Sequence, residues 1–358
     1  MKIGILGGGQ LSRMLALAGI PLGLQFFFYE PNDTSAVSGL GDITHGHYDD
    51  YETLTLFANK VDIITYENEN IPVKTLTFLE SHKTLYPNKN ALAIMQDRLC
   101  EKTLFCDLGI PTNAFFNVNS RQELQSAIDT LDYPLLLKKR TQGYDGKGQR
   151  KINNSREFEQ LTDTDCEHMI AEEWVMFDRE VSLIAVRNKS GEMAYYDIAE
   201  NTHKDGILHK TLNKTNDPIF ELANQYVTHI MTHLDYVGVM AVEFFEKNGQ
   251  LIANEMAPRV HNSGHWTIDA AIISQFENHL RAILNWPLGD TSSLFNAVMH
   301  NIIGTMPDKQ TVLAQKGTHL HDYHKAENPG RKIGHITSSF CHREKDDLLH
   351  LIKLNHHL

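Results

Sequence analysis

Two glutamates in a predicted β-hairpin are the side chains best suited to do chemistry. Residues 237–256 form a strand pattern, a turn containing an Asn-Gly pair and a second strand pattern. Glu243 and Glu255 both lie six residues from Gly249, so they face each other or are offset by one position. A three-residue turn would pair them directly, about 5 Å apart.

Paired carboxylates need a partner. At about 5 Å two ionised carboxylates repel by roughly 3 kcal/mol at an effective dielectric near 20. A shared proton, a basic side chain or a divalent cation would offset this repulsion. Oxygens from Glu243, Glu255 and the amide of Asn254 suit Mg²⁺, which usually keeps waters and substrate phosphates as further ligands. The alternative is an exposed acidic pair without a role.

A second candidate site follows a cationic strand. Residues 133–140 are predicted to form a strand that ends in Lys138-Lys139-Arg140, and the segment 143–148 then carries three glycines. Such a loop brings backbone N–H groups close to an anion and can open and close. It lacks the Gly-Lys-Ser/Thr ending of a Walker A loop. The alternative is a surface hairpin.

A first glycine loop near the N-terminus gives weaker evidence. Gly7-x-Gly9-x-x-Ser12, with Glu30 further on, is close to the dinucleotide fingerprint and by itself would favour an NAD-dependent dehydrogenase. Ser12 replaces the third glycine, which loosens the match. A tight strand-to-helix turn, or binding of another phosphate at the helix N-terminus, is the favoured explanation of the loop taken alone.

The elements around these motifs indicate several domains. Strand patterns at 2–6, 24–29 and 61–65 alternate with helical patterns, which predicts a parallel α/β domain over residues 1–95. The Gly7 loop and Glu67 both follow strands of this sheet, at the edge where ligands bind. Beyond it we expect a domain over 96–295, with short strands around a glycine-rich segment at about 112–175, and a C-terminal segment over 296–358.

Composition narrows the function classes. The chain has 358 residues, 41% hydrophobic and 22% charged, which is ample for a core. A net charge of −12 argues against a nucleic-acid partner. No run approaches the ~18 apolar residues of a membrane span, so we expect a cytoplasmic protein with no membrane partner. The four cysteines have neither metal-ligand nor redox spacing.

Taken in order, the motifs resemble the ATP-grasp superfamily. The matching segments are Lys138, 143–149, 172–175, 180–183 and the Glu243/Glu255 pair. Within the superfamily, the sequence resembles the N5-carboxyaminoimidazole ribonucleotide synthetase family through residues 9–11, 65–70, 138–149, 203–208, 257–266 and 329–335. The resemblance implies a multidomain α/β and α+β protein: an ATP-grasp fold with an N-terminal Rossmann-like domain and a small C-terminal β-rich domain.

The same resemblance implies a reaction. An ATP-dependent carbon–nitrogen ligase of purine biosynthesis would join bicarbonate to 5-aminoimidazole ribonucleotide through carboxyphosphate, with Mg²⁺ as cofactor and a homodimer as the assembly. The alternative within the superfamily is a formate-dependent glycinamide ribonucleotide transformylase, which would share the ATP site. The Tyr144-Asp145 pair inside the glycine loop favours the carboxylating ligase.

Site residues carried over from the family fall into four groups. ATP contacts are expected from Arg98, Lys138, Gly143, Tyr144, Asp145, Gly146, Lys147, Gly148, Gln149, Glu172, Glu173, Trp174, Val175, Glu180, His203, Asn254 and Glu255. Ribonucleotide contacts are expected from Gln10, Leu11, Glu67, Asn262, Lys325, Arg331 and Lys332. Glu243 and Glu255 are the expected metal ligands, and Tyr144, Asp145, Lys325 and Arg331 the expected catalytic residues.

Two positions depart from the family pattern. Ser12 stands where the family often has glycine, which would slightly perturb the substrate loop. Asn328 stands where an arginine commonly precedes Pro-Gly-Arg-Lys, so one phosphate-neutralising charge is expected to be missing.

Overall fold

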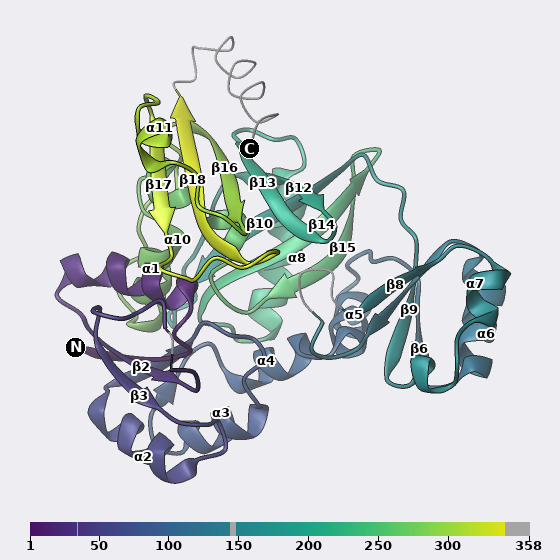
Figure 1. Ribbon diagram of the computed structural model, residues 1–358, viewed down its shortest axis with the longest axis horizontal. Helices are drawn as coiled ribbons and strands as arrows, with labels where there is room; N and C mark the ends of the chain where they lie inside the picture. The colour runs from purple at the N-terminus through teal and green to yellow at the C-terminus, as the bar shows by residue number, and fades with distance from the viewer. Residues whose placement is uncertain (34, 144–147, 341–358) are drawn as a thin grey trace.

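A computed structural model of the protein describes residues 1–33, 35–143 and 148–340 (Figure 1). Its N-terminal part is a parallel sheet in the order β3-β2-β1-β4-β5, as the alternating strand and helix patterns predict. The elements are β1 (Lys2–Leu6), α1 (Gln10–Gly19), β2 (Gln25–Glu30), β3 (Asp42–His45), α2 (Tyr51–Lys60), β4 (Ile63–Tyr66), α3 (Val73–Glu80) and β5 (Thr84–Leu85).

Two helices lead from this sheet into the rest of the molecule. They are α4 (Lys89–Met95) and α5 (Arg98–Asp107). The Asp97 side chain caps α5 by accepting from Leu99 N at 2.9 Å, and it also accepts from Arg140 Nε at 3.0 Å. Since Arg140 directly follows a strand of the next sheet, this cap fixes the start of α5, and with it Arg98, against that sheet.

The next sheet stands apart from the body of the molecule (Figure 1). It is antiparallel, in the order β6-β9-β7-β8, and has a hydrophobic core of its own. Its elements are β6 (Phe115–Val118), α6 (Arg121–Leu131), β7 (Leu135–Lys139), β8 (Gln149–Ile152), α7 (Ser155–Glu159) and β9 (Met169–Glu173). We call it the lid sheet.

The largest sheet is antiparallel and has the order β15-β14-β10-β12-β13-β16-β18-β17, with β11 also paired to β10. Its strands are β10 (Arg179–Arg187), β11 (Met193–Tyr195), β12 (Ile198–Lys204), β13 (Ile207–Lys214), β14 (Gly238–Lys247), β15 (Gln250–Ala257), β16 (Asn296–Ile303), β17 (Thr318–Asp322) and β18 (Lys332–Phe340). The helices that accompany them are α8 (Phe220–His233), α9 (Thr267–Ala270), α10 (Gln275–Ile283) and α11 (Lys309–Leu313).

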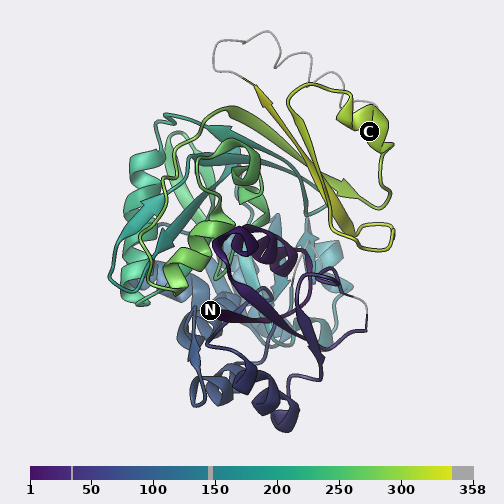
Figure 2. The same cartoon turned by 90° about the vertical axis from the view of Figure 1, so that its left-hand side faces the viewer.

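The C-terminal strands extend this sheet rather than forming one of their own. β16 pairs with β13, so β16, β18 and β17 continue the sheet above the N-terminal domain (Figure 2). The domain limits expected from the sequence stay a prediction. The expected boundary at 295/296 separates β13 from β16, and these two strands are hydrogen-bonded to each other in one sheet.

Shared cores hold the two larger sheets together. One hydrophobic cluster joins Ile3 and Ile5 of the parallel sheet to Ile184, Val239 and Trp266 of the large sheet and its connections. α10 packs against both α1 and β14. The carboxyl edge of the parallel sheet is therefore held rigidly beside the large sheet. Among the described residues, no helix combines the length and apolarity needed to cross a bilayer.

Candidate active site

A cleft of about 1010 Å³ lies where the three sheets meet. Twenty predicted site residues line it: Gln10, Leu11, Glu67, Arg98, Lys138, Gly143, Gln149, Glu172, Glu173, Trp174, Val175, Glu180, His203, Glu243, Asn254, Glu255, Asn262, Lys325, Arg331 and Lys332. Gly148 is described but does not line the cleft. The predicted residues Tyr144, Asp145, Gly146 and Lys147 lie outside the described part of the chain.

The carboxylate hairpin pairs its two glutamates directly. Glu243 on β14 is opposite Glu255 on β15, which confirms the predicted cross-strand pair. The reason differs from the expected three-residue turn. Only Asn248 and Gly249 separate the paired Lys247 and Gln250, and the register then shifts by one residue between Glu243 and its neighbour. Asn254 is the extra residue of this β-bulge, and the bulge brings the carboxylates into register.

The two glutamates have different electrostatic surroundings. Burial and the Glu255 charge raise the pKa of Glu243 to about 7. Burial also acts to raise the pKa of Glu255, but Arg98 outweighs it, and the pKa of Glu255 is lowered. Arg98 Nη1 lies 2.8 Å from Glu255 Oε2, and His261 Nε2 lies 3.4 Å from Glu243 Oε1. The pair therefore holds less than its full negative charge at neutral pH until a cation joins it.

The donor set fits a hard divalent cation. The buried Asn254 Oδ1 has no hydrogen-bond partner among the described residues. A buried carbonyl oxygen left unsatisfied is costly, and this one belongs to the bulge residue next to Glu255. Two carboxylates and an amide oxygen at one place form an oxygen-only ligand set of the kind that Mg²⁺ takes.

A buried ion pair holds Lys138 of the lid sheet, the lysine that is expected to contact phosphate. Lys138 Nζ lies 2.8 Å from Glu172 Oε2, and both side chains are almost fully buried. Burial alone would raise the pKa of Glu172, but Lys138 and Lys102 hold it well below its ordinary value. The carboxylate of Glu172 is thus engaged with lysine, while the expected adenine contacts of residues 172–175 stay a prediction.

Aromatic rings and a histidine pair form the next part of the cleft. Phe177 and Phe245 stack with their centroids 4.7 Å apart and both line the cleft. Nearby, His203 Nδ1 forms a short hydrogen bond with Glu180 Oε2. Burial acts to lower the pKa of His203, but its bond to Glu180 and the charge of Glu243 outweigh burial and raise it. The apolar faces suit a flat ring, and the polar pair suits hydroxyl groups.

The first glycine loop is filled by the protein's own carboxylates. Glu67 accepts from Gly9 N at 2.7 Å and from Leu11 N and Ser12 N at 3.0 Å. Glu30 accepts from Gly8 N at 2.6 Å. Because these N–H groups are the ones that would bind a pyrophosphate, the loop does not support the dehydrogenase alternative.

Glycine is required at the start of this loop for a steric reason. Gly7 has φ +104°, and a Cβ there would lie 2.6 Å from Glu67 Cγ. Ser12 does not disturb the arrangement, since its buried hydroxyl donates to Gly7 O at 2.7 Å. The departure at Ser12 is therefore accommodated inside the loop, away from the cleft.

The far end of the cleft gathers amides and cations. Gln10 Oε1 accepts a short hydrogen bond from Lys325 Nζ. Asn262 and Asn301 exchange hydrogen bonds of 3.0 and 2.7 Å through their amide groups. Arg331 and Lys332 also line the cleft. Cations and amide donors in one recess suit a phosphorylated small molecule.

Comparisons with known proteins agree with this geometry. Residues 1–96 match the ribonucleotide synthetase preATP-grasp domain, 103–276 the ATP-grasp domain, and 297–347 the phosphoribosylaminoimidazole carboxylase C-terminal domain. An N5-carboxyaminoimidazole ribonucleotide synthase of Pseudomonas aeruginosa is 47% identical over 341 residues, covering 94% of either chain. This chain belongs to the N5-carboxyaminoimidazole ribonucleotide synthase family.

Solved structures of the family have the same fold. The N5-carboxyaminoimidazole ribonucleotide synthetase of Thermus thermophilus superposes with a TM-score of 0.90 at 46% identity, covering 94% of this chain and 93% of that one. The N5-carboxyaminoimidazole synthase of Aspergillus clavatus, solved with ADP and 5-aminoimidazole ribonucleotide, gives 0.90 at 28% identity, covering 100% and 99%. The predicted ATP-grasp architecture is therefore confirmed.

Sequence reasoning missed two buried charges of this family member, Glu101 and Lys102. Glu101 lines the cleft and accepts from Met256 N at 2.6 Å. Lys102 is fully buried and donates to Asn113 Oδ1 at 2.6 Å. Their spacing from Arg98, three and four residues along α5, is the signal that could have revealed them, since it places all three on one helix face.

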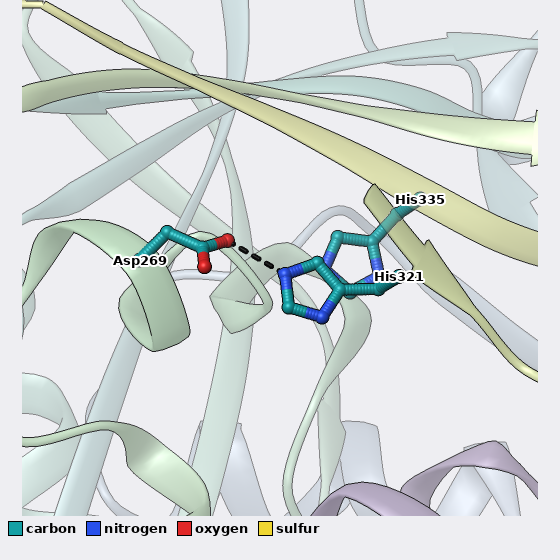
Figure 3. Close-up of side chains that lie close together, drawn as sticks. All are labelled: Asp269, His321 and His335. Carbon is teal, nitrogen blue, oxygen red and sulfur yellow. Dashed lines mark hydrogen bonds and ion pairs between the residues drawn. The ribbon is translucent and has the colours of Figure 1, made fainter. Parts of the chain in front are cut away.

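A histidine cluster lies behind the amide end of the cleft. His321 Nε2 donates to Asp269 Oδ2 at 2.8 Å, and His335 lies against His321 (Figure 3). The two rings stack with centroids 4.2 Å apart and 10° between their planes. Ring nitrogens bind metals in the ring plane, so two parallel rings do not direct lone pairs at one ion. His335 Nδ1 instead hydrogen-bonds with the Tyr323 hydroxyl at 2.7 Å, so as they lie these side chains form a polar cluster and not a metal centre.

Proposed function

We propose that this protein uses ATP to carboxylate the amino group of 5-aminoimidazole ribonucleotide with bicarbonate, giving N5-carboxyaminoimidazole ribonucleotide, ADP and phosphate in purine biosynthesis. The observation that carries the proposal is one cleft lined by two sets of cations from different parts of the chain. Arg98 and Lys138 lie near Glu255, Lys325 lies beside Gln10 and Glu67, and Arg331 and Lys332 line the same cleft. A nucleotide triphosphate and a ribonucleotide phosphate can thus occupy a single cavity.

In the proposed ATP site the protein positions the phosphates and stabilises their negative charge. Arg98 and Lys138 contact phosphate oxygens, and Glu172 keeps the lysine in place through its 2.8 Å bond. Glu243, Glu255 and Asn254 would hold Mg²⁺, which when bound neutralises charge on the phosphates. Catalysis of phosphoryl transfer is largely such positioning and charge stabilisation.

The reaction needs activation because bicarbonate is a poor electrophile. Transfer of the terminal phosphoryl group gives carboxyphosphate, which carries a good leaving group. The substrate's amine then bonds to the carboxyl carbon, the bond from that carbon to the phosphate oxygen breaks, and phosphate leaves. Asp145, outside the described residues, would orient the amine or accept its proton, beside Tyr144. Closure of the segment from Gly143 to Gln149 would exclude water, which otherwise hydrolyses the intermediate.

An omission assay tests the proposal. ADP release is measured with ATP, bicarbonate and 5-aminoimidazole ribonucleotide, and then with each omitted in turn. We expect fast release only with all three. Release that depends on formate and glycinamide ribonucleotide would favour the transformylase alternative instead. Family membership favours carboxylation over formyl transfer.

We further infer a homodimer acting in the cytoplasm, as the family resemblance implies. Light scattering on the eluting protein is expected to give twice the mass of one chain. A mass of one chain at micromolar concentration would contradict the dimer.

A further inference from the structure

The outer edge of β15 is held by α5 and by the segment that follows it, where Ala253 N donates to Pro111 O at 2.7 Å in an isolated parallel bridge. β15 is the edge strand of the large sheet, so its outward backbone groups need partners from elsewhere. Ala253 O accepts from Thr112 Oγ1 at 2.7 Å and from Lys102 Nζ at 3.2 Å. Met256 N donates to Glu101 Oε1 at 2.6 Å. Consecutive residues of α5 thus hold the backbone on both sides of the bulge.

The bulged residues between these two attachments are the ligand candidates Asn254 and Glu255. Arg98, on the same face of α5, adds a third attachment through its 2.8 Å ion pair with Glu255. Residues 111–112 hold the start of this segment, and α5 attaches to the backbone on both sides of the bulge and to the Glu255 carboxylate. A shift of about 1 Å is enough to spoil a metal or phosphate site.

Lys102 also connects the bulge to the lid sheet. Its Nζ lies 2.6 Å from Asn113 Oδ1 and 3.8 Å from Glu172 Oε2. Asn113 Nδ2 in turn donates to Glu172 Oε2 at 3.1 Å, the oxygen that accepts from Lys138. The carboxylate that positions the phosphate lysine and the backbone that positions the metal ligands thus share one buried cation.

Both charges are buried at a cost. Lys102 is 0% exposed and Glu101 is 2% exposed. Burial lowers the pKa of Lys102 to about 8 and raises that of Glu101 to about 8. Apolar side chains of similar volume would often fill such a place with no loss of stability. Directed hydrogen bonds to particular backbone atoms explain why charged groups are present.

We propose that Glu101 and Lys102 are positioning residues that fix the Asn254–Glu255 bulge for the divalent cation and the ATP phosphates. The inference rests on the proposed ATP and metal site, and it concerns residues that act through the bulge they hold. Loss of Lys102 should loosen cation binding at the hairpin and leave ribonucleotide binding at Lys325 and Arg331 nearly unaffected.

The experiment compares Lys102→Met with Lys89→Met. Lys89 lies on α4, pairs with Glu80 at 2.5 Å and does not line the cleft, so it is a matched loss of one ion-paired lysine. Mn²⁺ affinity is measured by electron paramagnetic resonance with a non-hydrolysable ATP analogue, and ribonucleotide affinity by calorimetry. For Lys102→Met we expect Mn²⁺ affinity to fall on the order of tenfold, with ribonucleotide affinity changing less than about twofold. Lys89→Met should change neither.

Conservative variants separate positioning from packing. Glu101→Gln keeps an acceptor for Met256 N and should retain most of the Mn²⁺ affinity, whereas Glu101→Leu should lose on the order of tenfold. If Lys102→Met does not fold, Thr112→Val tests the proposal in its place. This variant removes one hydrogen-bond donor to Ala253 O, and its Mn²⁺ affinity should fall about threefold.

Two results would overturn the proposal. One is unchanged Mn²⁺ affinity in folded Lys102→Met, or in Thr112→Val where that variant decides. The other is an equal loss of Mn²⁺ and ribonucleotide affinity, which would indicate general loosening. Failure of the carboxylation reaction would appear separately, as missing ADP release in the unmodified protein, because cation binding is measured without turnover.

Discussion

Two pairs of glutamates, one at the first glycine loop and one in the β14–β15 hairpin, have opposite hydrogen-bonding situations. Glu30 and Glu67 accept from backbone N–H groups of the first glycine loop. Glu243 and Glu255 face each other across a hairpin, beside an amide oxygen that has no partner among the described residues. The first pair is satisfied within the fold, whereas the second lies beside an open acceptor, which is why we propose a cation there. The function of a carboxylate pair therefore depends on what already occupies its oxygens.

The largest expected effect comes from breaking the second pair. Glu255→Gln removes a charged cation ligand and the ion pair with Arg98, so turnover should fall about a thousandfold, or ~4 kcal/mol of activation free energy. Repulsion with Glu243 also disappears, so the melting temperature should not fall. Steady-state ADP release and thermal melting measure both effects. Full ATPase activity in this variant would contradict the metal role of the pair.

The proton held by the second pair gives the next prediction. Glu243 has an ordinary pKa of 4.5 and a folded pKa of about 7. Without metal, Glu243 keeps its proton in the folded state between pH 4.5 and about 7, whereas the unfolded chain has released it. The contribution of Glu243 to the free energy of unfolding therefore falls as pH rises through this range. A bound cation displaces this proton, so Mg²⁺ affinity should rise up to about tenfold per pH unit below pH 7 and level off above it.

Calorimetry in buffers of different ionisation enthalpy counts the released proton. We expect nearly one proton per Mg²⁺ at about pH 6 and close to none at about pH 8. The charged groups around Glu243 are Glu255, His203, Glu180 and Lys332, and of these His203 also has a raised pKa. Glu180→Gln removes the negative charge that faces His203 and serves as the control for that contribution. Absence of proton release at the lower pH would contradict a protonated pair.

The pairing of Glu243 with Glu255 could be predicted from their equal spacing from Gly249, but the physical reason could not, since the two-residue turn alone would place Glu243 opposite Asn254. The β-bulge at Asn254 could not be predicted, since it depends on contacts that α5 makes with an edge strand. The parallel sheet likewise predicted that Glu67 lies near the first glycine loop. That its carboxylate would take up the loop's N–H groups depends on tertiary geometry, which strand periodicity does not encode.

Lys325 and Arg331 sharpen the contrast, because we expect them to bind one substrate alone. Arg331→Ala or Lys325→Ala removes a charge from the ribonucleotide end, and loss of a charge-assisted phosphate contact costs about 1.5–3 kcal/mol. The Michaelis constant for 5-aminoimidazole ribonucleotide should therefore rise roughly tenfold or more, with that for ATP changing little. An equal rise in both constants would show that the two ends do not act separately.

The smallest expected effect is on the free energy of unfolding, which allows the two glutamate pairs to be compared in one measurement. Glu67→Gln leaves one acceptor oxygen for three backbone donors, so the free energy of unfolding should fall by about 1–3 kcal/mol. Glu243→Gln relieves repulsion in the metal-free protein, so its unfolding free energy should stay level or rise by about 1 kcal/mol. Urea unfolding without divalent cations measures both. If Glu243→Gln destabilises the protein as much as Glu67→Gln does, the hairpin pair is a structural element like the first, and its assignment to a cation fails.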